Sequence, residues 1–243
     1  MSALSNGFRI IEAVAGDGAG LTFSEIVETT AVPKASVHRL LRELVELSAL
    51  AYDESTRRYR GGLLLAGLGA SVMQNYDVRR VVRPHLEALQ EATGNVATLG
   101  IRNGEHGVYV DKIEPAGFGI RLHSEIGKSF PLHCTAMGKV LLAHSDAATV
   151  NRVTRRKLKA YTANTMTDGK RLREELDAVA RQGYAVDNEE ITRGLVCVAA
   201  PIFGVDGSVQ AAISCTVSSF DADDRYLETV KDQVIACAER ASG

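Results

Sequence analysis

The chain has 243 residues, of which 45% are hydrophobic and 24% are charged, so we expect two folded domains of unequal size. Its net charge of −2 excludes a protein that is basic throughout, so any contact with nucleic acid depends on how the charges are distributed. No apolar run approaches the roughly 20 residues that span a bilayer, the N-terminus lacks a secretion signal, and the 4 cysteines form no C-x-x-C pair, which together predict a soluble cytoplasmic protein with reduced thiols.

The first part of the chain predicts two short helices. Apolar residues recur at helical spacing between Leu4 and Val14, and a glycine-rich loop follows. Thr22 and Glu25 then have the spacing of a capping box, in which each side chain accepts a hydrogen bond from the other residue's backbone N–H. The second helix therefore begins after Thr22 and ends near Thr29.

A third helix carries the most informative pattern. Pro33 suits its first turn, and apolar residues from Val37 to Val45 follow the i, i+3, i+4, i+7 pattern of a core-facing side. Small and basic residues occupy the opposite face, as in the recognition helix of a helix-turn-helix. Arg39 suits a bidentate contact to a guanine edge. The candidate DNA contacts on this helix are Lys34, Ala35, Ser36, His38, Arg39 and Arg42.

A short hairpin is predicted next, from residues 50–52 and 58–60 around a polar turn. It has the place and size of a wing, and its candidate contacts to the DNA backbone are Arg57, Arg58 and Arg60. Neither residues 32–42 nor residues 55–62 contain an acidic residue, so the basic residues are segregated on one face although the domain is not basic overall. The alternative is that these arginines only solvate an exposed helix and hairpin.

Two further regions follow the hairpin. The sequence predicts a DNA-binding domain of residues 1–62, a linker helix of residues 63–80 with a wide apolar stripe, and a domain of residues 81–243. In the last, we expect a helix from about Val81, then strands at 96–101, 107–113, 119–123, 185–187, 195–200 and 209–217, and helices near 138–144, 169–182 and 222–241. These elements predict an antiparallel sheet flanked by helices, which can hold a small ligand over one face.

Four blocks of the sequence resemble the IclR family of bacterial transcription regulators, in the family's order and over essentially the whole chain. They are residues 21–26 with 32–41, residues 131–143, residues 160–168, and residues 183–190 with 194–201. The resemblance implies an α+β protein in which a winged helix-turn-helix is joined by a linker helix to a GAF-like antiparallel-sheet effector domain. It also implies a homodimer, or a dimer of dimers, that binds a pseudo-palindromic operator in double-stranded DNA. The alternative is that the linker's apolar stripe packs only on its own chain.

The resemblance places a small-molecule effector between the loop before residue 138 and the late strands. The effector-binding residues that it implies are Leu122, Thr135, Ala136, Met137, Asp187, Leu195, Cys197, Ser214 and Thr216. A helix N-terminus near Gly138 offers free amides to a carboxylate. We therefore expect a regulator, most simply a repressor of a catabolic operon, that responds to an organic acid or an aromatic catabolite.

Two other functions stay open. Cys134 or Cys197 suggests a thiol enzyme or a redox sensor, and Asp187, Glu189 and Glu190 with His106, His123 and His133 suggest acid–base chemistry or a metal site. No H-x-x-x-H, C-x-x-C or phosphate loop accompanies them, so we expect no catalysis, no cofactor and no metal. The basic run from Arg152 to Lys159 suggests a protein-interaction patch, but such a run more often forms a solvated helix.

Overall fold

The computed structural model describes residues 2–74, 77–115 and 124–243. The chain divides into two compact units, Met1–Tyr76 and Asp77–Gly243, which are described in turn. Within the described parts, no helix is both long enough and apolar enough to cross a bilayer.

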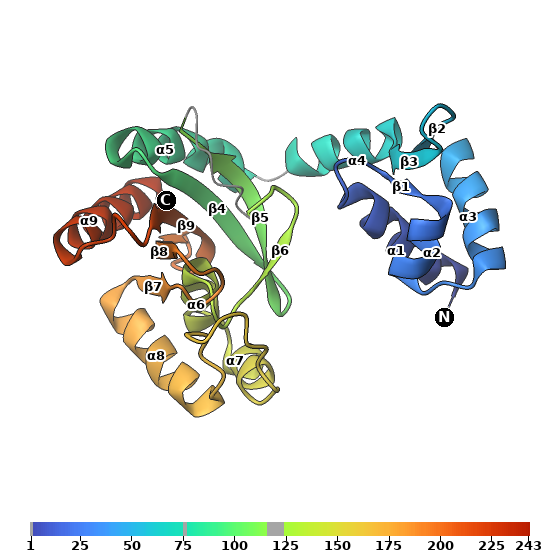
Figure 1. The fold of residues 1–243 in the computed structure, drawn as a ribbon. Coiled ribbons are helices and arrows are strands. Elements are labelled where there is room, and N and C mark those ends of the chain that lie inside the picture. The colour runs from blue at the N-terminus through green and yellow to red at the C-terminus, as the bar shows by residue number, and fades with distance from the viewer. Residues whose placement is uncertain (1, 75–76, 116–123) are drawn as a thin grey trace. The chain divides into compact units, whose positions relative to one another are not determined.

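The N-terminal unit is the winged helix-turn-helix that the sequence predicts (Figure 1). Its elements are α1 (Ala3–Ala15), β1 (Leu21–Thr22), α2 (Phe23–Thr30), α3 (Lys34–Glu46), β2 (Leu50–Asp53), β3 (Arg58–Gly61) and α4 (Leu63–Gln74). The strands form an antiparallel sheet in the order β1-β3-β2, and the β2–β3 hairpin is the wing.

Local contacts define where α2 begins and ends. The predicted capping box is confirmed, since the Thr22 N–H donates to Glu25 Oε2 over 2.7 Å and the Glu25 N–H donates to Thr22 Oγ1 over 3.4 Å. Ala31 ends α2 in the left-handed region, with φ of 51°. Pro33 lies at the N-cap of α3, one position before the first turn that we expected for it.

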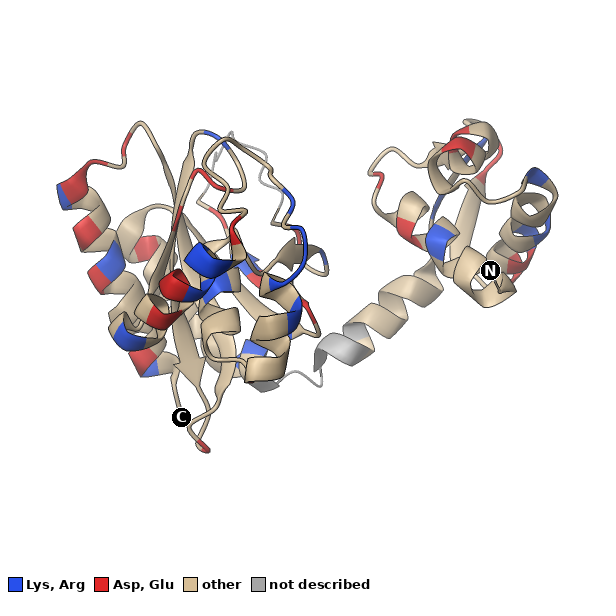
Figure 2. Cartoon of the chain, turned by 90° about the horizontal axis from the view of Figure 1, so that it is seen from below, with Lys and Arg blue, Asp and Glu red and all other residues tan. Residues whose placement is uncertain are grey.

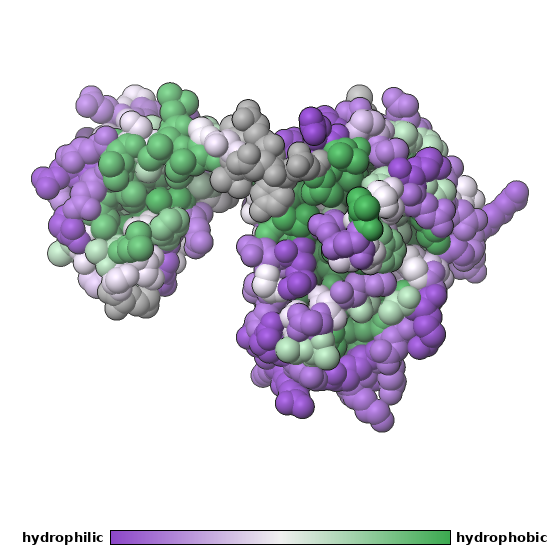
Figure 3. All heavy atoms as spheres, turned by 180° about the vertical axis from the view of Figure 1, so that it is seen from behind, coloured by the Kyte–Doolittle hydropathy of each residue, from purple (hydrophilic) through white to green (hydrophobic). Residues whose placement is uncertain are grey.

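Helices α1 and α4 leave large apolar side chains in contact with solvent. Leu63 is 85% exposed and Leu68 is 55% exposed, and Leu4 and Phe8 on α1 are exposed as well. Apolar atoms gather over one face of this unit (Figure 3). Of the predicted apolar stripe, Leu65 packs against the core of this unit, whereas Leu63 and Leu68 are exposed on it.

The C-terminal unit contains a six-stranded antiparallel sheet in the order β6-β5-β4-β9-β8-β7. Its elements are α5 (Asp77–Thr93), β4 (Val96–Asn103), β5 (His106–Ile113), β6 (Ser129–Pro131), α6 (Ala136–Ala143), α7 (Ala147–Thr154), α8 (Gly169–Gln182), β7 (Ala185–Asn188), β8 (Leu195–Phe203), β9 (Val209–Ser218) and α9 (Asp224–Ala241). The predicted α+β class is confirmed. The predicted strand 119–123 lies outside the described residues, β6 and α7 were not predicted, and the predicted linker 63–80 covers α4 and the first residues of α5.

Helices α5 and α9 pack on one face of this sheet, and α6 packs on the other with α7 and α8 beside it (Figure 1). Small residues let α6 come close to the strands. Ala185, Ala199 and Ala212 are fully buried on this face, and a Cβ on Gly100 would lie 2.9 Å from the Phe130 ring. The small side chains on this face therefore let α6 pack directly against the strands.

Candidate functional sites

The exposed face of α3 carries the predicted DNA contacts. Lys34, Ala35, His38, Arg39 and Arg42 are exposed and Ser36 is half-buried, whereas the apolar residues of the same helix are buried. Basic residues occupy the first part of α3 and acidic residues its end (Figure 2). The predicted contacts thus share one exposed face of α3, with the basic residues N-terminal to the acidic ones.

Two of these cations have a partner on their own helix. Arg39 Nη1 lies 2.8 Å from Glu43 Oε1, and Arg42 Nε lies 3.8 Å from Glu46 Oε1. All four side chains are largely exposed, and an exposed i,i+4 pair contributes only about 0.3–0.5 kcal/mol. Either arginine can therefore leave its carboxylate for a base or a phosphate at little cost.

The arginines of the wing differ in direction. Arg57 and Arg60 are exposed, and Arg57 has a positive φ of 55° at the tip of the hairpin. Arg58 instead donates to the carbonyl of Gly20 and lies 3.3 Å from Glu25, the carboxylate of the capping box. In the unbound chain, Arg58 therefore joins the wing to the start of α2.

Three predicted effector residues lie side by side on the sheet beneath α6. Cys197 on β8 pairs in register with Asp187 on β7 and with Thr216 on β9, and its thiol lies 3.3 Å from the Thr216 hydroxyl. Ser214 lies two residues along β9, and its hydroxyl is 2.6 Å from that of Thr98. The hydroxyl groups of Thr98, Ser214 and Thr216 and the thiol of Cys197 form a layer beneath α6 that we call the polar floor.

The start of α6 is buried against that floor. The Thr135 hydroxyl accepts a hydrogen bond from the Gly138 N–H over 3.0 Å and donates to the Pro131 carbonyl over 2.8 Å. Ala136 and Met137 follow it and are buried. Of the remaining predicted residues, Leu195 is half-buried at the start of β8, two residues before Cys197, and Leu122 lies outside the described residues.

A pocket of about 710 Å³ lies in this unit. Its lining comprises Tyr109, Ser129, Phe130, Pro131, Tyr161, Thr162, Ala163, Ile191, Thr192 and Arg193, and includes none of the predicted effector residues. Tyr109 lines this pocket and also lies near the polar floor beneath α6. Burial raises the pKa of its hydroxyl, and the nearby Cys197 and Asp187 raise that pKa further. Tyr109 thus belongs to the pocket wall and lies within electrostatic range of the polar floor.

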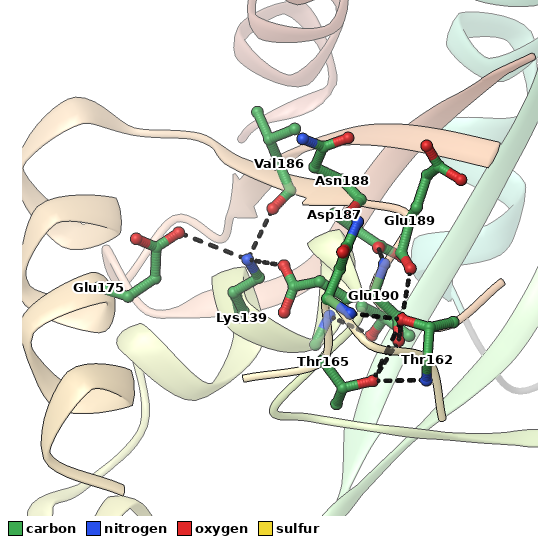
Figure 4. A network of polar contacts seen from close by, with 12 residues as sticks. Lys139, Thr162, Thr165, Glu175, Val186, Asp187, Asn188, Glu189 and Glu190 are labelled. Carbon is green, nitrogen blue, oxygen red and sulfur yellow. Dashed lines mark hydrogen bonds and ion pairs between the residues drawn. The ribbon is translucent and has the colours of Figure 1, made fainter. Parts of the chain in front are cut away.

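The buried ammonium group of Lys139 lies at the centre of a network of polar contacts (Figure 4). Lys139 is 2% exposed, and its Nζ lies 2.6 Å from both Glu190 Oε1 and the carbonyl oxygen of Val186. The Asp187 carboxylate accepts the Glu190 N–H over 2.7 Å, and the Thr165 hydroxyl donates to the Glu190 carbonyl over 2.6 Å. Glu190 therefore anchors the segment whose next three residues line the pocket.

The sequence reasoning missed this network, since it considered Glu190 only for acid–base chemistry and gave Lys139 no role. One signal was present: Lys139 is the only charged residue in the apolar run from Ala136 to Ala143. A lysine within such a run is buried only when it is paired. Tyr109, Phe130 and Tyr161 were also missed, since no sequence pattern brings three rings from separate segments together.

Burial sets the protonation of the buried groups. It raises the pKa of Asp187 to about 7, against the opposing effect of the Glu190 N–H and Lys139. Burial also raises the pKa of the Cys134 and Cys197 thiols, so both stay protonated, which does not favour a thiol nucleophile or a redox sensor. Within the described residues, no group of three or more His, Cys, Asp or Glu side chains is arranged to hold a metal ion.

The basic run from Arg152 to Lys159 does not form a helix along its length, which corrects the expectation of a solvated helix. Helix α7 ends at Thr154, so only Arg152 of the run is helical. Arg152 and Arg156 form ion pairs with Glu105, and Lys159 lies over the ring of Tyr161 at 4.8 Å. Part of the run is thus neutralised within the unit.

Known proteins resemble the chain along its whole length. A model of the IclR helix-turn-helix domain matches residues 3–54, and a model of the bacterial transcriptional regulator IclR C-terminal domain matches residues 70–243. The HTH-type transcriptional regulator BhcR of Paracoccus denitrificans is 33% identical, over 99% of this chain and 86% of that protein.

Solved structures agree with this relationship. The crystal structure of an IclR transcriptional regulator from Alicyclobacillus acidocaldarius has a TM-score of 0.84 at 30% identity, covering 99% of this chain and 97% of that one. An IclR homologue from Microbacterium hydrocarbonoxydans, complexed with 4-hydroxybenzoate, has a TM-score of 0.84 at 23% identity and covers 99% of this chain and 98% of that one, a likeness of fold. Because the family models match both units and BhcR is related over nearly the whole chain, this protein belongs to the IclR family of bacterial transcriptional regulators.

Proposed function

We propose that the protein is a homodimeric repressor of a catabolic operon, and that a small organic acid or aromatic catabolite controls its affinity for the operator. The observation that carries the proposal is the pocket of about 710 Å³ in the C-terminal unit, outside the winged helix-turn-helix. This volume lies within the usual range for sites that bury a small ligand. A cytoplasmic location, predicted from the sequence, fits this function.

The lining of the pocket favours an aromatic or elongated acid. Tyr109 and Phe130 pack with ring centroids 4.6 Å apart, and Tyr161 supplies a third ring from another segment. Arg193 is exposed at the lining and has no ion-pair partner among the described residues, so its guanidinium can take a carboxylate. The homologue complexed with 4-hydroxybenzoate gives an example of such a ligand.

The effector residues implied by the family resemblance complete this proposal. Thr135, Ala136 and Met137 would meet the ligand from α6, and Asp187, Leu195, Cys197, Ser214 and Thr216 would meet it from the sheet. A ligand whose acid group is held at Arg193 could direct its opposite end past Tyr109 to Asp187. Control of DNA binding then requires that the ligand bind one arrangement of the dimer better than the other.

The proposed dimer uses the apolar side chains that α1 and α4 leave exposed, on the unit that must place two recognition helices on one operator. Leu63 and Leu68 lie on α4, and Leu4 and Phe8 lie on α1. A second copy of the chain would cover both pairs, and a two-fold axis would match a pseudo-palindrome. A dimer of dimers through the C-terminal unit is compatible with this arrangement.

Replacing Arg39 tests the DNA contact. We expect Arg39→Ala to weaken operator binding by about 1–3 kcal/mol and to relax the base preference at one position of each half-site. The operator is first located by footprinting upstream of the protein's own gene, and affinities for its single-base variants are then measured. Arg155→Ala, which alters an exposed cation of the other unit, should bind as the wild type does. Equal weakening on every sequence would make Arg39 a phosphate contact instead.

Replacing Leu68 tests the dimer. We expect Leu68→Asp to shift the protein from dimer to monomer at micromolar concentration, because an unpaired carboxylate buried in the interface costs several kcal/mol. Sedimentation velocity measures the change. Leu47→Asp is the matched control, since Leu47 is also exposed in the same unit but lies at the end of α3. A dimer that survives Leu68→Asp with unchanged affinity contradicts the proposed interface.

Replacing Arg193 tests the recognition of an acid. A thermal-shift screen with benzoate, 4-hydroxybenzoate and small aliphatic carboxylates identifies a ligand, and its effect on operator binding is then measured. We expect Arg193→Gln to weaken its binding by about tenfold or more, the loss of a charge-assisted hydrogen bond, and Arg193→Lys to retain part of the affinity. Arg155→Gln is the control. Chemical turnover of the ligand by the purified protein would instead support the enzyme alternative.

Asp187 makes the stability of the protein depend on pH. In the unfolded chain this carboxyl has the ordinary aspartate pKa of 3.8, whereas its pKa in the folded chain is about 7, so its favourable contribution is complete below pH 3.8 and is lost as the pH rises through about 7. Asp187→Asn removes this titration and keeps an acceptor for the Glu190 N–H. We expect urea unfolding to give a difference between wild type and variant that changes by up to about 4 kcal/mol over this range. A difference that stays constant with pH would mean that the pKa of Asp187 is the same in the folded and the unfolded chain.

A further inference from the structure

Strand β5 contains a bulge at the point where the pocket meets the rest of the sheet. Leu99 of β4 pairs with Asp111, but the next residue, Gly100, pairs with Tyr109, so Val110 is an extra residue on β5. Residues two apart on a regular strand share a face. Here the bulge turns Tyr109 and Asp111 to opposite faces of the sheet.

The Tyr109 side of the bulge belongs to the pocket wall. Its ring packs on Phe130, and its backbone bonds to the segment before β6: the Tyr109 N–H donates to the Lys128 carbonyl over 3.0 Å, and its carbonyl accepts from the Gly127 N–H over 2.8 Å. A ligand in the pocket would therefore contact Tyr109, whose backbone is next to the bulge.

The Asp111 side of the bulge holds the start of α5. Asp111 is 0% exposed, and each of its carboxylate oxygens lies 3.0 Å from Arg83 Nη1. Arg79 Nε adds a second guanidinium 3.2 Å from Asp111 Oδ2. Both arginines belong to the first two turns of α5, so one buried carboxylate ties those turns to the bulge.

The backbone of α5 is weakest at the end of these two turns. Pro84 lies inside the helix, and a proline has no N–H to donate to the carbonyl four residues earlier. Asp77–Arg83 therefore depends more than usual on its side-chain anchors. This segment is also the first of the C-terminal unit, so it is the part of that unit that is directly continuous with the N-terminal unit in sequence.

We propose that Asp111 is a positioning residue that transmits the state of the pocket wall, through the bulge at Val110, to the first two turns of α5. This inference rests on the proposed function, because it assigns the route by which the effector would act on the linker. A displacement of Tyr109 moves Asp111 in the opposite sense about the bulge. The carboxylate then loses the geometry that lets it hold Arg79 and Arg83 together, and the turns before Pro84 loosen.

Hydrogen exchange in the full chain without effector or DNA tests this link. Removing the ring with Tyr109→Leu should make the amides of Val82 and Arg83 exchange about fivefold faster or more. Asp111→Asn and Arg83→Gln, which alter the two sides of the contact directly, should each have a similar effect, and Arg83→Gln stays informative if Asp111→Asn fails to fold. The double variant Tyr109→Leu with Arg83→Gln should exchange little faster than either single variant, because both act on the same contact.

Tyr161→Leu is the matched control, since it removes a ring from the same pocket on a segment that is not next to the bulge. It should leave exchange at Val82 and Arg83 unchanged. If Tyr109→Leu also leaves these rates unchanged, or if Tyr161→Leu raises them equally, the assigned route is wrong.

A second measurement separates this inference from the proposed function. With a ligand found by thermal shift, Arg83→Gln should bind the ligand with the wild-type Kd but lose most of the ligand's effect on operator affinity. A full effect in this variant overturns the route while the proposed function stands. If no ligand changes the operator affinity of the wild type, the proposed function fails, and the exchange data still decide whether the bulge links Tyr109 to α5.

Discussion

The pocket side of the C-terminal unit depends on one buried cation. Lys139 lies inside the layer between α6 and the sheet, where a charge is tolerated only when it is paired and hydrogen-bonded. Its partners come from different parts of the chain: the Glu190 carboxylate, the Val186 carbonyl and, at 3.4 Å, Glu175 of α8. Removing one partner of a buried pair costs about 3–5 kcal/mol, so this contact fixes where β7 ends and where the pocket wall begins.

The wall itself follows from that anchor. The backbone after β7 turns through Glu189, which has a positive φ of 57°, and the Glu189 carboxylate accepts the Gly194 N–H over 2.7 Å to close the loop. Thr162 fastens the loop from outside by donating to the Glu189 carbonyl over 2.7 Å, and also lines the pocket. Arg193 is thus carried by a short, closed loop, so the position of its backbone at the pocket is fixed.

Local patterns predicted much of the fold, and contacts distant in sequence account for what they missed. The capping box at Thr22 and the apolar spacing of α3 lie within a few residues, so the sequence alone predicts them. The inward turn of Arg58 and the burial of Lys139 depend on residues more than ten positions away, and the bulge at Val110 depends on how β5 pairs with β4. The pocket was missed for the same reason, because its rings meet only after the sheet has formed.

Each unit contains an ion pair between a basic and an acidic side chain, and the two pairs differ in how much energy is needed to break them. The exposed pair of Arg39 and Glu43 contributes a few tenths of a kcal/mol, about the scale of thermal energy, so a DNA phosphate or base can take the arginine from it. The buried pair of Lys139 and Glu190 lies in a low-dielectric layer and breaks only when the layer opens. The proposed function would use both: cations that exchange partners where DNA would be read, and a fixed cation beside the pocket that would hold the ligand.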